Sequence, residues 1–284
     1  MSAPLLGRLR PVSASHPDSR RYLLARRHAL PRADSVMAIA GHWAHRQALE
    51  FAASIEVLLW CAGGSEPQLS SLDLLERLLS RADAAYEISE RTLARLQPGA
   101  DAPGLLSVVR LPRWQPRELL NGPAGLVLVC DGIEYAGNLG SLLRTVDASG
   151  ADGLIVTNPV ARLTHPAIFS ASRGTVLTTP NLELLTVDRA RDELAGAGFQ
   201  LVVADPDAAV DFRSLGYGAR RTAVVVGAEG AGVSRAWRDA ATHCVSIPMR
   251  GRADSLNVAT AAGVLLFEAT HPREPEPAGS RGKE

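Results

Sequence analysis

The chain has 284 residues, 46% of them hydrophobic and 21% charged, and its formal net charge at pH 7 is zero. This composition is that of a globular protein, and the length allows two domains. The longest apolar runs, "GLVLVC" and "AVVVG", are too short to cross a bilayer, and early arginines interrupt any signal-peptide core. We therefore expect a cytoplasmic protein with no membrane partner.

The start of the chain is basic. Its first 46 residues hold arginines at positions 8, 10, 20, 21, 26, 27, 32 and 46, against only Asp18 and Asp34. Such clustering is typical of a surface that binds a polyanion, and a solvated basic tail is the alternative. Residues 1–18 mix Pro, Ser and Arg without periodicity, so we predict a flexible basic N-terminus there.

Residues 19–115 alternate helix-like and strand-like segments and predict a small α/β domain. The segments are "SVMAIAG", "HWAHRQALEFAA", "SIEVLLWC", "SSLDLLERLLSRA", "AAYEISERTLARL" and "GLLSVVRLP". Pro116 and Pro123 mark a break within residues 112–124. Cys61, Cys130 and Cys244 stand far apart among apolar residues, a spacing that fits buried thiols and neither a disulfide framework nor a metal site.

Residues 124–271 predict a second, larger α/β domain. Strands are expected at 126–131, 153–157, 199–204, 222–227 and 244–248, and helices at about 139–149, 188–197, 234–241 and 256–269. Strands that are apolar throughout and alternate with helices predict a parallel sheet covered on both faces. Residues 272–284 are polar and rich in proline, and we predict disorder for them.

Polar residues follow three of these strands, where ligands bind in parallel α/β sheets. They are Asn138, Gly140 and Arg144 after the first strand, Gly227, Glu229, Gly230 and Gly232 after the fourth, and Ser255 and Asn257 after the fifth. Each has a structural alternative: a strand-to-helix turn for Asn138 and Gly140, a helix cap for Glu229 or Ser255, tight geometry for the glycines, and a turn for Asn257. The dinucleotide and P-loop patterns are absent. Together the three groups indicate a small polar ligand, with an arginine for a phosphate.

In order and spacing, "GNLGSLLRTVDASGADGLIV", "VVVGAEGAGVS" and "IPMRGRADSLNVATAAGVLLFEA" resemble the three motifs of the SpoU/TrmH family of RNA 2′-O-ribose methyltransferases. The small-residue segment "SASRGT" lies between the first two motifs, as in the family. A proline common in the family is replaced by Ala136. Residues 19–115 resemble, more loosely, the ribosomal-protein-like domain that binds RNA in such enzymes.

The resemblance implies a C-terminal domain with a deep trefoil knot around residues 225–258, S-adenosyl-L-methionine as cofactor without a metal, and RNA as substrate. It implies a homodimer through the knotted region, to which the last helix could contribute, although an ordinary core helix fits equally. Expected catalytic residues are Asn138, Arg144, Glu229, Ser255 and Asn257. Expected cofactor contacts are Gly227, Glu229, Ile247, Met249, Leu256 and Asn257. Expected RNA contacts are Arg20, Arg21, Arg26, Arg27, Arg144 and Arg173.

By the same resemblance Arg144 lies beside the attacking hydroxyl. A guanidinium stays protonated in proteins, so we expect Arg144 to hold the ribose and phosphate and to stabilise the developing alkoxide rather than to act as a base. The composition and layout are similar to those of actinomycete self-resistance enzymes that methylate large-subunit ribosomal RNA. The alternatives are methylation of tRNA or of a base, a non-catalytic RNA-binding protein of the same fold, and an unrelated nucleotide-binding enzyme.

Overall fold

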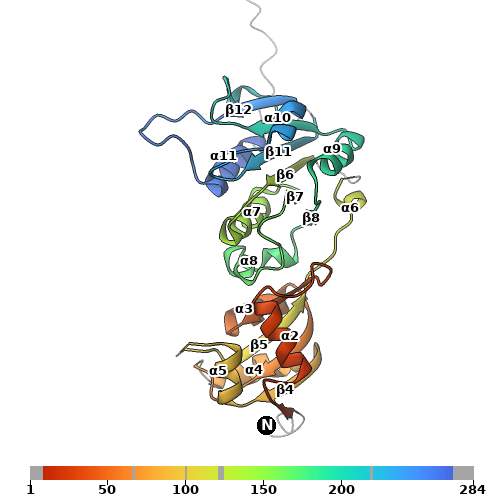
Figure 1. Ribbon diagram of the computed structural model, residues 1–284, viewed down its shortest axis with the longest axis vertical. Coiled ribbons are helices and arrows are strands. Elements are labelled where there is room, and N and C mark those ends of the chain that lie inside the picture. Colours follow the sequence, from red (N-terminus) through yellow and green to blue (C-terminus); the bar gives the residue numbers. More distant parts are fainter. Residues whose placement is uncertain (1–8, 66–67, 100, 121–124, 218–219, 271–284) are drawn as a thin grey trace, which may run out of the picture.

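The computed structural model describes residues 9–65, 68–99, 101–120, 125–217 and 220–270, which form two α/β domains stacked along one long axis (Figure 1). The predicted tail at 272–284 lies outside the described residues, as do residues 1–8 of the predicted flexible N-terminus. No helix in the described ranges combines the length and the apolar character needed to span a membrane.

The N-terminal domain is built on a five-stranded mixed sheet of order β1-β4-β3-β5-β2. Its elements are β1 Arg10–Val12, α2 Pro17–Arg26, β2 Val36–Ala40, α3 His42–Glu50, β3 Ser54–Trp60, α4 Gln68–Leu79, β4 Ala82–Ile88, α5 Glu90–Leu96 and β5 Leu105–Arg110. Strands β1, β3 and β4 run parallel, whereas β5 is antiparallel to both β3 and β2. Helices α2 and α5 bury one face of the sheet and α3 and α4 bury the other.

Part of the segment expected to be flexible is ordered. Strand β1 pairs in parallel with β4, and α2 begins at Pro17. Proline is favoured at the first position of a helix because its missing N–H has no partner there. His16 caps this helix, since its Nδ1 accepts a hydrogen bond from the Asp18 N–H at 3.3 Å. Because α2 has almost no hydrophobic periodicity, the apolar pattern of the sequence did not reveal it.

The C-terminal domain is built on a seven-stranded parallel sheet of order β10-β12-β9-β11-β6-β7-β8. Its elements are β6 Leu126–Asp131, α7 Ala136–Ser149, β7 Gly153–Thr157, α8 Pro166–Ala171, β8 Asn181–Glu183, α9 Val187–Gly196, β9 Gln200–Ala204, β10 Val210–Asp211, β11 Thr222–Gly227, α10 Arg235–Ala240, β12 His243–Ser246 and α11 Val258–Thr270. Two short 3₁₀ turns, Thr175–Leu177 and Phe212–Ser214, complete it, and α6 (Pro116–Leu120) precedes it in the predicted linker.

The predicted parallel sheet is confirmed. All five expected strands are present within one or two residues of their predicted bounds, and the structure adds α8 and the short edge strands β8 and β10. The trefoil knot around residues 225–258 stays a prediction. Cys61 and Cys130 are buried and Cys244 is half-buried, and burial raises the pKa of the Cys130 thiol, which keeps it protonated and unreactive.

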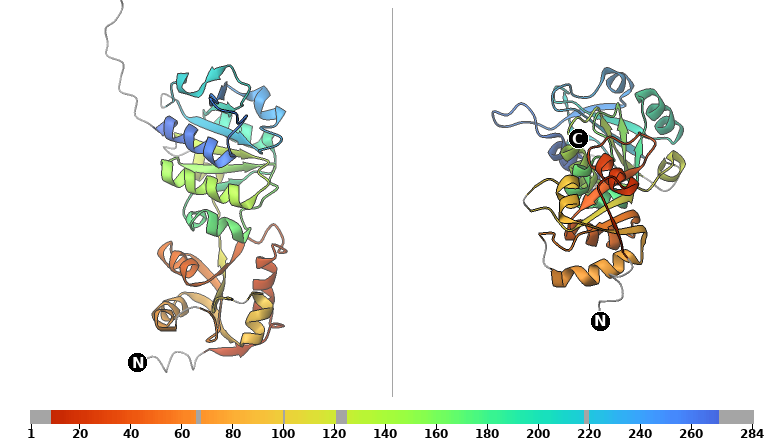
Figure 2. Two further views of the ribbon diagram at one scale, coloured as in Figure 1. Left: turned by 90° about the vertical axis from the view of Figure 1, so that its left-hand side faces the viewer. Right: turned by 60° about the horizontal axis from the view of Figure 1, so that its bottom comes forward.

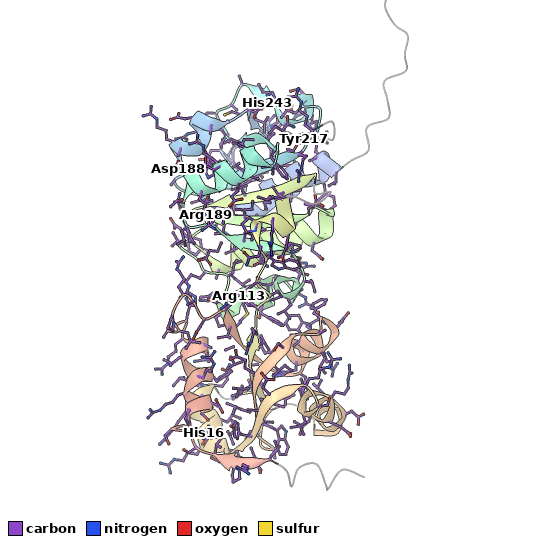
Figure 3. All side chains as sticks on the ribbon, turned by 90° about the vertical axis from the view of Figure 1, so that its right-hand side faces the viewer. His16, Arg113, Asp188, Arg189, Tyr217 and His243 are labelled. Carbon is purple, nitrogen blue, oxygen red and sulfur yellow. The ribbon has the colours of Figure 1, made fainter. Side chains whose placement is uncertain are left out.

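The two domains meet through the segment after α2 and through α3, which face α8 and its flanks (Figure 2). Arg32 forms an ion pair with Glu183 at 2.6 Å, and the Arg162 guanidinium donates to the carbonyls of Leu30 and Pro31 at 3.4 Å. Arg113, at the waist between the domains (Figure 3), donates to the Ala33 carbonyl at 2.8 Å. These bonds hold the linker and the loop before β2 against the C-terminal domain.

Candidate active site

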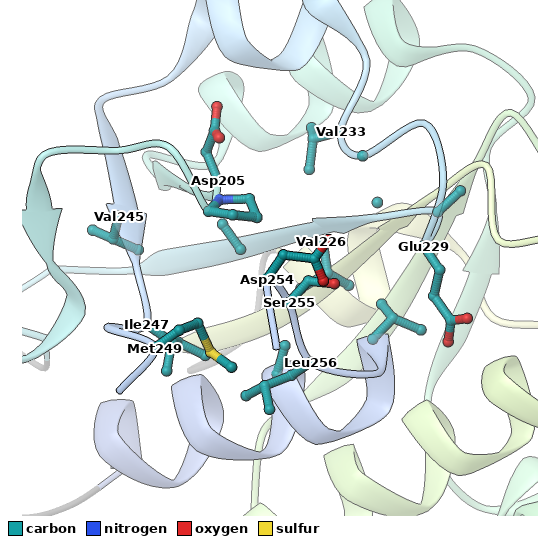
Figure 4. Close-up of a pocket in the computed structure, with 17 residues that line it drawn as sticks. Asp205, Val226, Glu229, Val233, Val245, Ile247, Met249, Asp254, Ser255 and Leu256 are labelled. Atoms are coloured by element: carbon teal, nitrogen blue, oxygen red, sulfur yellow. The ribbon is translucent and has the colours of Figure 1, made fainter. Parts of the chain in front are cut away.

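A pocket opens where strands β9, β11 and β12 end, at the start of α11 (Figure 4). We call it the C-terminal pocket, and its lining residues are Ala204–Pro206, Val226–Glu229, Gly232, Val233, Val245, Ile247, Met249, Asp254–Leu256, Val258 and Ala261. The carboxyl ends of parallel strands are where α/β sheets bind ligands. The structure thus brings together five residues predicted to contact a cofactor: Gly227, Glu229, Ile247, Met249 and Leu256. The sixth, Asn257, does not line the pocket.

Gly227 is required by the backbone geometry of this pocket. A Cβ on Gly227 would lie 2.1 Å from the Gly232 carbonyl oxygen and 2.3 Å from the Val233 nitrogen. The loop after β11 folds back on itself here, with the Gly232 N–H donating to the Ala228 carbonyl at 2.8 Å and Gly232 in the left-handed region at φ +67°. The glycines of the second motif therefore shape the pocket wall by close backbone approach.

A buried carboxylate holds the far end of the same loop. Asp131, the last residue of β6, is 3% exposed and accepts hydrogen bonds from Thr157 Oγ1, Asn158 Nδ2 and the Ser234 N–H at 2.8–3.0 Å. The Trp237 indole N–H in turn donates to Thr157 Oγ1 at 3.2 Å. These bonds satisfy a charge that burial alone would penalise. Sequence reasoning missed this network, although an acidic residue as the last residue of an otherwise apolar strand was a signal for it.

Three motif side chains meet in a hydrogen-bonded triad at the edge of the pocket. Asn138 Nδ2 donates to Glu229 Oε1 at 2.9 Å, and Asn257 Nδ2 donates to the same oxygen at 2.5 Å and to Asn138 Oδ1 at 3.3 Å. Hydrogen bonds to a charged acceptor are stronger than neutral ones. The Asn138–Glu229–Asn257 triad thus ties α7, the loop after β11 and the start of α11 together.

The structural alternatives proposed for these residues are wrong in three respects. Asn138 and Gly140 lie inside α7, which begins at Ala136, and not in a turn before it. Neither Glu229 nor Ser255 caps a helix: Asn257 caps α11, with its Oδ1 accepting from the Ala259 N–H at 3.0 Å. The change from the family's proline to Ala136 falls at the first position of α7, where alanine is also well tolerated.

Arg144 is exposed on α7 and has no hydrogen-bond or ion-pair partner among the described residues. Six residues separate it from Asn138, which places it about 9 Å further along the helix axis. Gly140, between them, lets α7 pack closely on α8, since a Cβ there would lie 2.6 Å from the Ala171 Cβ and 3.0 Å from the Ile168 carbonyl oxygen. Arg144 therefore projects, unpaired, from a helix that is fixed on both sides.

The other arginines predicted to contact RNA lie in different surroundings. Arg20 and Arg27 are exposed on and just after α2. Arg21 forms ion pairs within the N-terminal domain, with Glu56 at 2.8 Å and with Asp34 at 3.3 Å. The hydrogen bond with Glu56 raises the pKa of Arg21. Arg26 and Arg173 lie at the junction of the domains. Among the described residues, no hydrogen bond, ion pair or ring contact links these five arginines with Arg144.

The lining of the C-terminal pocket fits S-adenosylmethionine, a ligand with a flat adenine ring, whose faces pack on apolar walls and whose edge forms hydrogen bonds, and with a cationic sulfonium. Val226, Val245, Ile247 and Leu256 supply apolar walls, and the main chain around Gly227 offers hydrogen-bonding groups. The Asp205 and Asp254 side chains provide negative charge, which complements a cation. Among the described residues there is no cluster of three or more side chains suited to hold a metal ion.

Comparison with known proteins identifies the family. Residues 125–267 match the model of the SpoU rRNA Methylase family. An uncharacterized tRNA/rRNA methyltransferase of Synechocystis is 30% identical over 196 residues, which cover 69% of this chain and 70% of that protein. A putative TrmH family tRNA/rRNA methyltransferase of Staphylococcus haemolyticus is 35% identical over 147 residues, 52% of this chain and 59% of that relative.

Solved structures extend the likeness to both domains. The SpoU methyltransferase AviRb from Streptomyces viridochromogenes, solved with AdoMet, is 26% identical with a TM-score of 0.77, over 90% of this chain and 97% of that one. An RNA 2′-O ribose methyltransferase is 29% identical with a TM-score of 0.69, over 92% and 98%. An AdoMet-bound rRNA methyltransferase from Sinorhizobium meliloti shares the fold, with a TM-score of 0.78 at 22% identity over 92% of this chain and 97% of that one. The chain belongs to the SpoU methylase family of RNA methyltransferases.

Proposed function

We propose that this protein transfers the methyl group of S-adenosylmethionine to a ribose 2′-hydroxyl of RNA in the cytoplasm, and that its substrate is 23S ribosomal RNA. The observation that carries the proposal is the Asn138–Glu229–Asn257 triad, which joins all three family motifs at the edge of a pocket suited to the methyl donor. Glu229 belongs to both the triad and the pocket lining, so the triad adjoins the place where the donor would bind.

Two tasks fall to the chain in this reaction. When bound, S-adenosylmethionine supplies an activated methyl group, so no metal is needed. The protein has to hold the ribose in line with that methyl, which accounts for much of the rate in such reactions, and to stabilise the charge that develops on the 2′-oxygen.

We assign positioning of the ribose to Asn138, Glu229, Ser255 and Asn257. Ser255 lines the C-terminal pocket, and the other three form the triad beside it. We assign stabilisation of the developing alkoxide to Arg144, whose guanidinium has no hydrogen-bond or ion-pair partner among the described residues.

We further propose a homodimer formed through the C-terminal domain. Helix α11 buries Val258, Ala262, Leu265 and Leu266 against its own domain, whereas Phe267 on the same helix is 54% exposed. An exposed aromatic on an otherwise apolar helix is a feature of subunit contacts. Sedimentation of wild type and of Phe267→Asp tests this: we expect a dimer for wild type and a monomer for the variant, and a monomeric wild type would contradict the proposal.

Ribosomal RNA is favoured over tRNA by the two-domain layout, in which a ribosomal-protein-like domain precedes the methyltransferase domain. The sequence resembles the avilamycin-resistance methyltransferase. The similarity to the AviRb structure covers 90% of this chain and therefore extends over both of its domains. This supports a methylation that protects the ribosome against an antibiotic.

The test is transfer of labelled methyl groups from S-adenosylmethionine to unmodified 23S rRNA and, separately, to unmodified tRNA. We expect label in 23S rRNA at a single nucleotide. Label in tRNA alone would replace the proposed substrate. Binding of S-adenosylmethionine and RNA without transfer to any RNA would contradict the enzymatic proposal and favour a non-catalytic RNA-binding protein.

A further inference from the structure

A second cavity lies between the domains and shares no residue with the C-terminal pocket. We call it the interdomain groove. Its walls come from α2, β2 and α3 of the N-terminal domain and from α8 of the C-terminal domain, and they include Arg26, Trp43, Gln97, Phe169 and Ser170. Figure 1 shows α8 directly facing α3 across this junction. None of the described residues that line the groove is acidic, so its charge comes from arginine alone.

Trp43 gives the groove an aromatic surface that is accessible from solvent. The side chain is 36% exposed, although it is the second residue of α3 and neighbours buried positions. Its ring lies nearly perpendicular to that of Phe169 at a centroid distance of 5.8 Å, and the Arg173 guanidinium lies over the Trp43 ring at 4.6 Å. Aromatic rings and arginine planes are the surfaces on which proteins stack unpaired bases.

Arg173 is held beside Trp43 at an energetic cost. Its backbone φ is +57°, a left-handed conformation that is unfavourable for a residue with a side chain. The next residue, Gly174, is also left-handed at φ +87°, and a Cβ there would lie 3.0 Å from the Phe51 ring. This turn of the C-terminal domain therefore packs tightly against α3. A residue held in a strained conformation at a domain junction is a candidate for function.

Arg26 lines the groove and Arg173 lies beside it on Trp43, and both differ from neighbouring arginines in having no ion pair with the described residues. Arg26 and Arg173 form no ion pair with any described residue, whereas Arg21 is bound to Glu56 and Arg32 to Glu183. An unpaired guanidinium offers its fork of donors to phosphate oxygens without breaking a bond in the protein. The cationic groups of the groove are thus available to a polyanion.

The floor of the groove offers hydrogen bonds from the main chain. Strand β2 is the edge of its sheet and pairs with β5 alone. Gly41 N–H donates to the Leu105 carbonyl, and Leu111 N–H donates to the Ser35 carbonyl. These two bonds show which residues of β2 are hydrogen-bonded to β5 and which point their main-chain groups to the open edge. In an antiparallel pair every second residue points its N–H and C=O away from the partner. Ala38 and Ala40 are those residues, and both line the groove. Ala38 is buried and Ala40 is half-buried, so the main-chain groups of Ala40 are the more open of the two to the edge of a base.

We propose that the interdomain groove binds an unstacked nucleotide of the substrate RNA close to the methylated one, with its base on Trp43 and Arg173 and its phosphate on Arg26. The proposal rests on the proposed function, since it takes RNA as the substrate. Helix α8 forms one wall of the groove and packs its other side on α7, the helix that carries Asn138 and Arg144. One helix therefore separates the groove from the catalytic arginine, so adjacent parts of one RNA strand can reach both.

The test compares RNA affinity, S-adenosylmethionine affinity and methyl transfer in groove variants. The loss of one base-stacking contact by alanine substitution costs about 1–3 kcal/mol. Trp43→Ala is therefore expected to weaken RNA binding about 5- to 150-fold, while the Kd for S-adenosylmethionine and kcat at saturating RNA stay within about twofold. Arg26→Ala is expected to weaken RNA binding and to lower the slope of log K against log salt by about 0.7, the value for one phosphate on a single strand. The Trp43→Ala slope stays unchanged.

Two controls separate binding from folding. Arg189→Ala removes the same charge from α9, away from the junction (Figure 3), and is expected to leave RNA affinity unchanged. Trp43→Phe keeps a ring at the site, so it is expected to retain most of the RNA affinity. In wild type, RNA is expected to quench part of the tryptophan fluorescence, and this part is expected to vanish in Trp43→Phe.

Each failure has its own meaning. If Trp43→Ala and Arg26→Ala bind and methylate RNA as well as wild type does, the groove proposal is overturned. The proposed function stays intact in that case. Absence of any methyl transfer by wild type would instead contradict the proposed function. Quenching by an extended peptide but not by RNA would also overturn the proposal, because an edge strand can accept a peptide strand.

Discussion

The C-terminal pocket and the interdomain groove are built in opposite ways. The pocket is assembled inside one domain from strand ends and glycine-lined loops, and the backbone around Gly227 defines its wall. The groove forms only where α2, β2 and α3 of one domain meet α8 of the other, and side chains such as Trp43 and Arg26 define it. The first arrangement suits an invariant small ligand, and the second suits a variable macromolecular one.

The largest effect is expected at Arg144. Arg144→Ala removes the charge assigned to the developing alkoxide, and the loss of one such donor reduces kcat about 100- to 1,000-fold. Because Arg144 does not line the pocket, the Kd for S-adenosylmethionine is expected to stay unchanged. Single-turnover methyl transfer and calorimetric titration measure the two quantities. An Arg144→Ala rate within a few-fold of wild type would remove Arg144 from the reaction.

The next effect concerns the wall of the pocket. Gly227→Ala places a methyl group 2.1 Å from the Gly232 carbonyl oxygen, so the loop has to move. Overpacking costs about 1–3 kcal/mol, and if the loop bears this cost when it closes on the ligand, S-adenosylmethionine affinity falls about 5- to 150-fold. Gly230→Ala in the same loop is the matched control, because no heavy atom lies within 4 Å of its new Cβ. Equal affinities for the two variants would refute this account of the wall.

The helix pair between the two sites gives a third prediction. Gly140→Ala forces α7 away from Ala171 on α8 and is expected to lower the free energy of unfolding by about 1–3 kcal/mol. Gly137→Ala on the same helix meets no heavy atom within 4 Å and is expected to raise that free energy by up to about 1 kcal/mol. Urea denaturation of both variants measures the difference, and a Gly140→Ala protein as stable as wild type would show that α7 and α8 do not pack so closely.

A fourth prediction is a pH dependence of stability, which arises beside the groove. His45 on α3 is fully buried between the Gly41 carbonyl at 2.7 Å and Ser107 Oγ at 2.8 Å, and burial lowers its pKa to about 4. The folded protein keeps this ring neutral while the unfolded chain protonates it below about pH 6.5. Its contribution to stability is therefore complete above pH 6.5 and falls by about 1.4 kcal/mol per pH unit until pH 4.

Denaturation at pH 7.5 and pH 5 measures this dependence. A His45→Gln variant lacks the titrating ring, so its stability is expected to change less between the two pH values than that of wild type. An identical change in both proteins would contradict the assignment to His45.

The two regions also differ in how far the sequence predicted them. The central parts of β6 and β11, "LVLVC" and "AVVV", are apolar throughout, so the positions of these strands followed from the pattern alone. The short strands β8 and β10 were missed because two or three residues carry no periodicity. The motif residues were found because each set is local in sequence, yet their meeting in a triad depends on tertiary packing.

The groove could not be predicted because its parts are distant in the chain. Trp43 and Arg173 are 130 positions apart, and nothing local indicates their contact. The same limit applies to the arginines of α2. Arg21 and Arg26 lie on the same helix, and nothing in the sequence distinguishes them. Arg21 forms ion pairs because Glu56 and Asp34 lie beside it in the folded protein, whereas Arg26 has no ion pair with the described residues.

The most direct test of the central claim is nucleoside analysis of 23S rRNA methylated by the wild-type protein with labelled S-adenosylmethionine. Complete digestion to nucleosides and separation identify the atom that carries the methyl group. The account predicts label in one 2′-O-methyl nucleoside, formed about 100- to 1,000-fold more slowly by Arg144→Ala. Label on a base would contradict it, because the triad and Arg144 would then serve a different methylation chemistry.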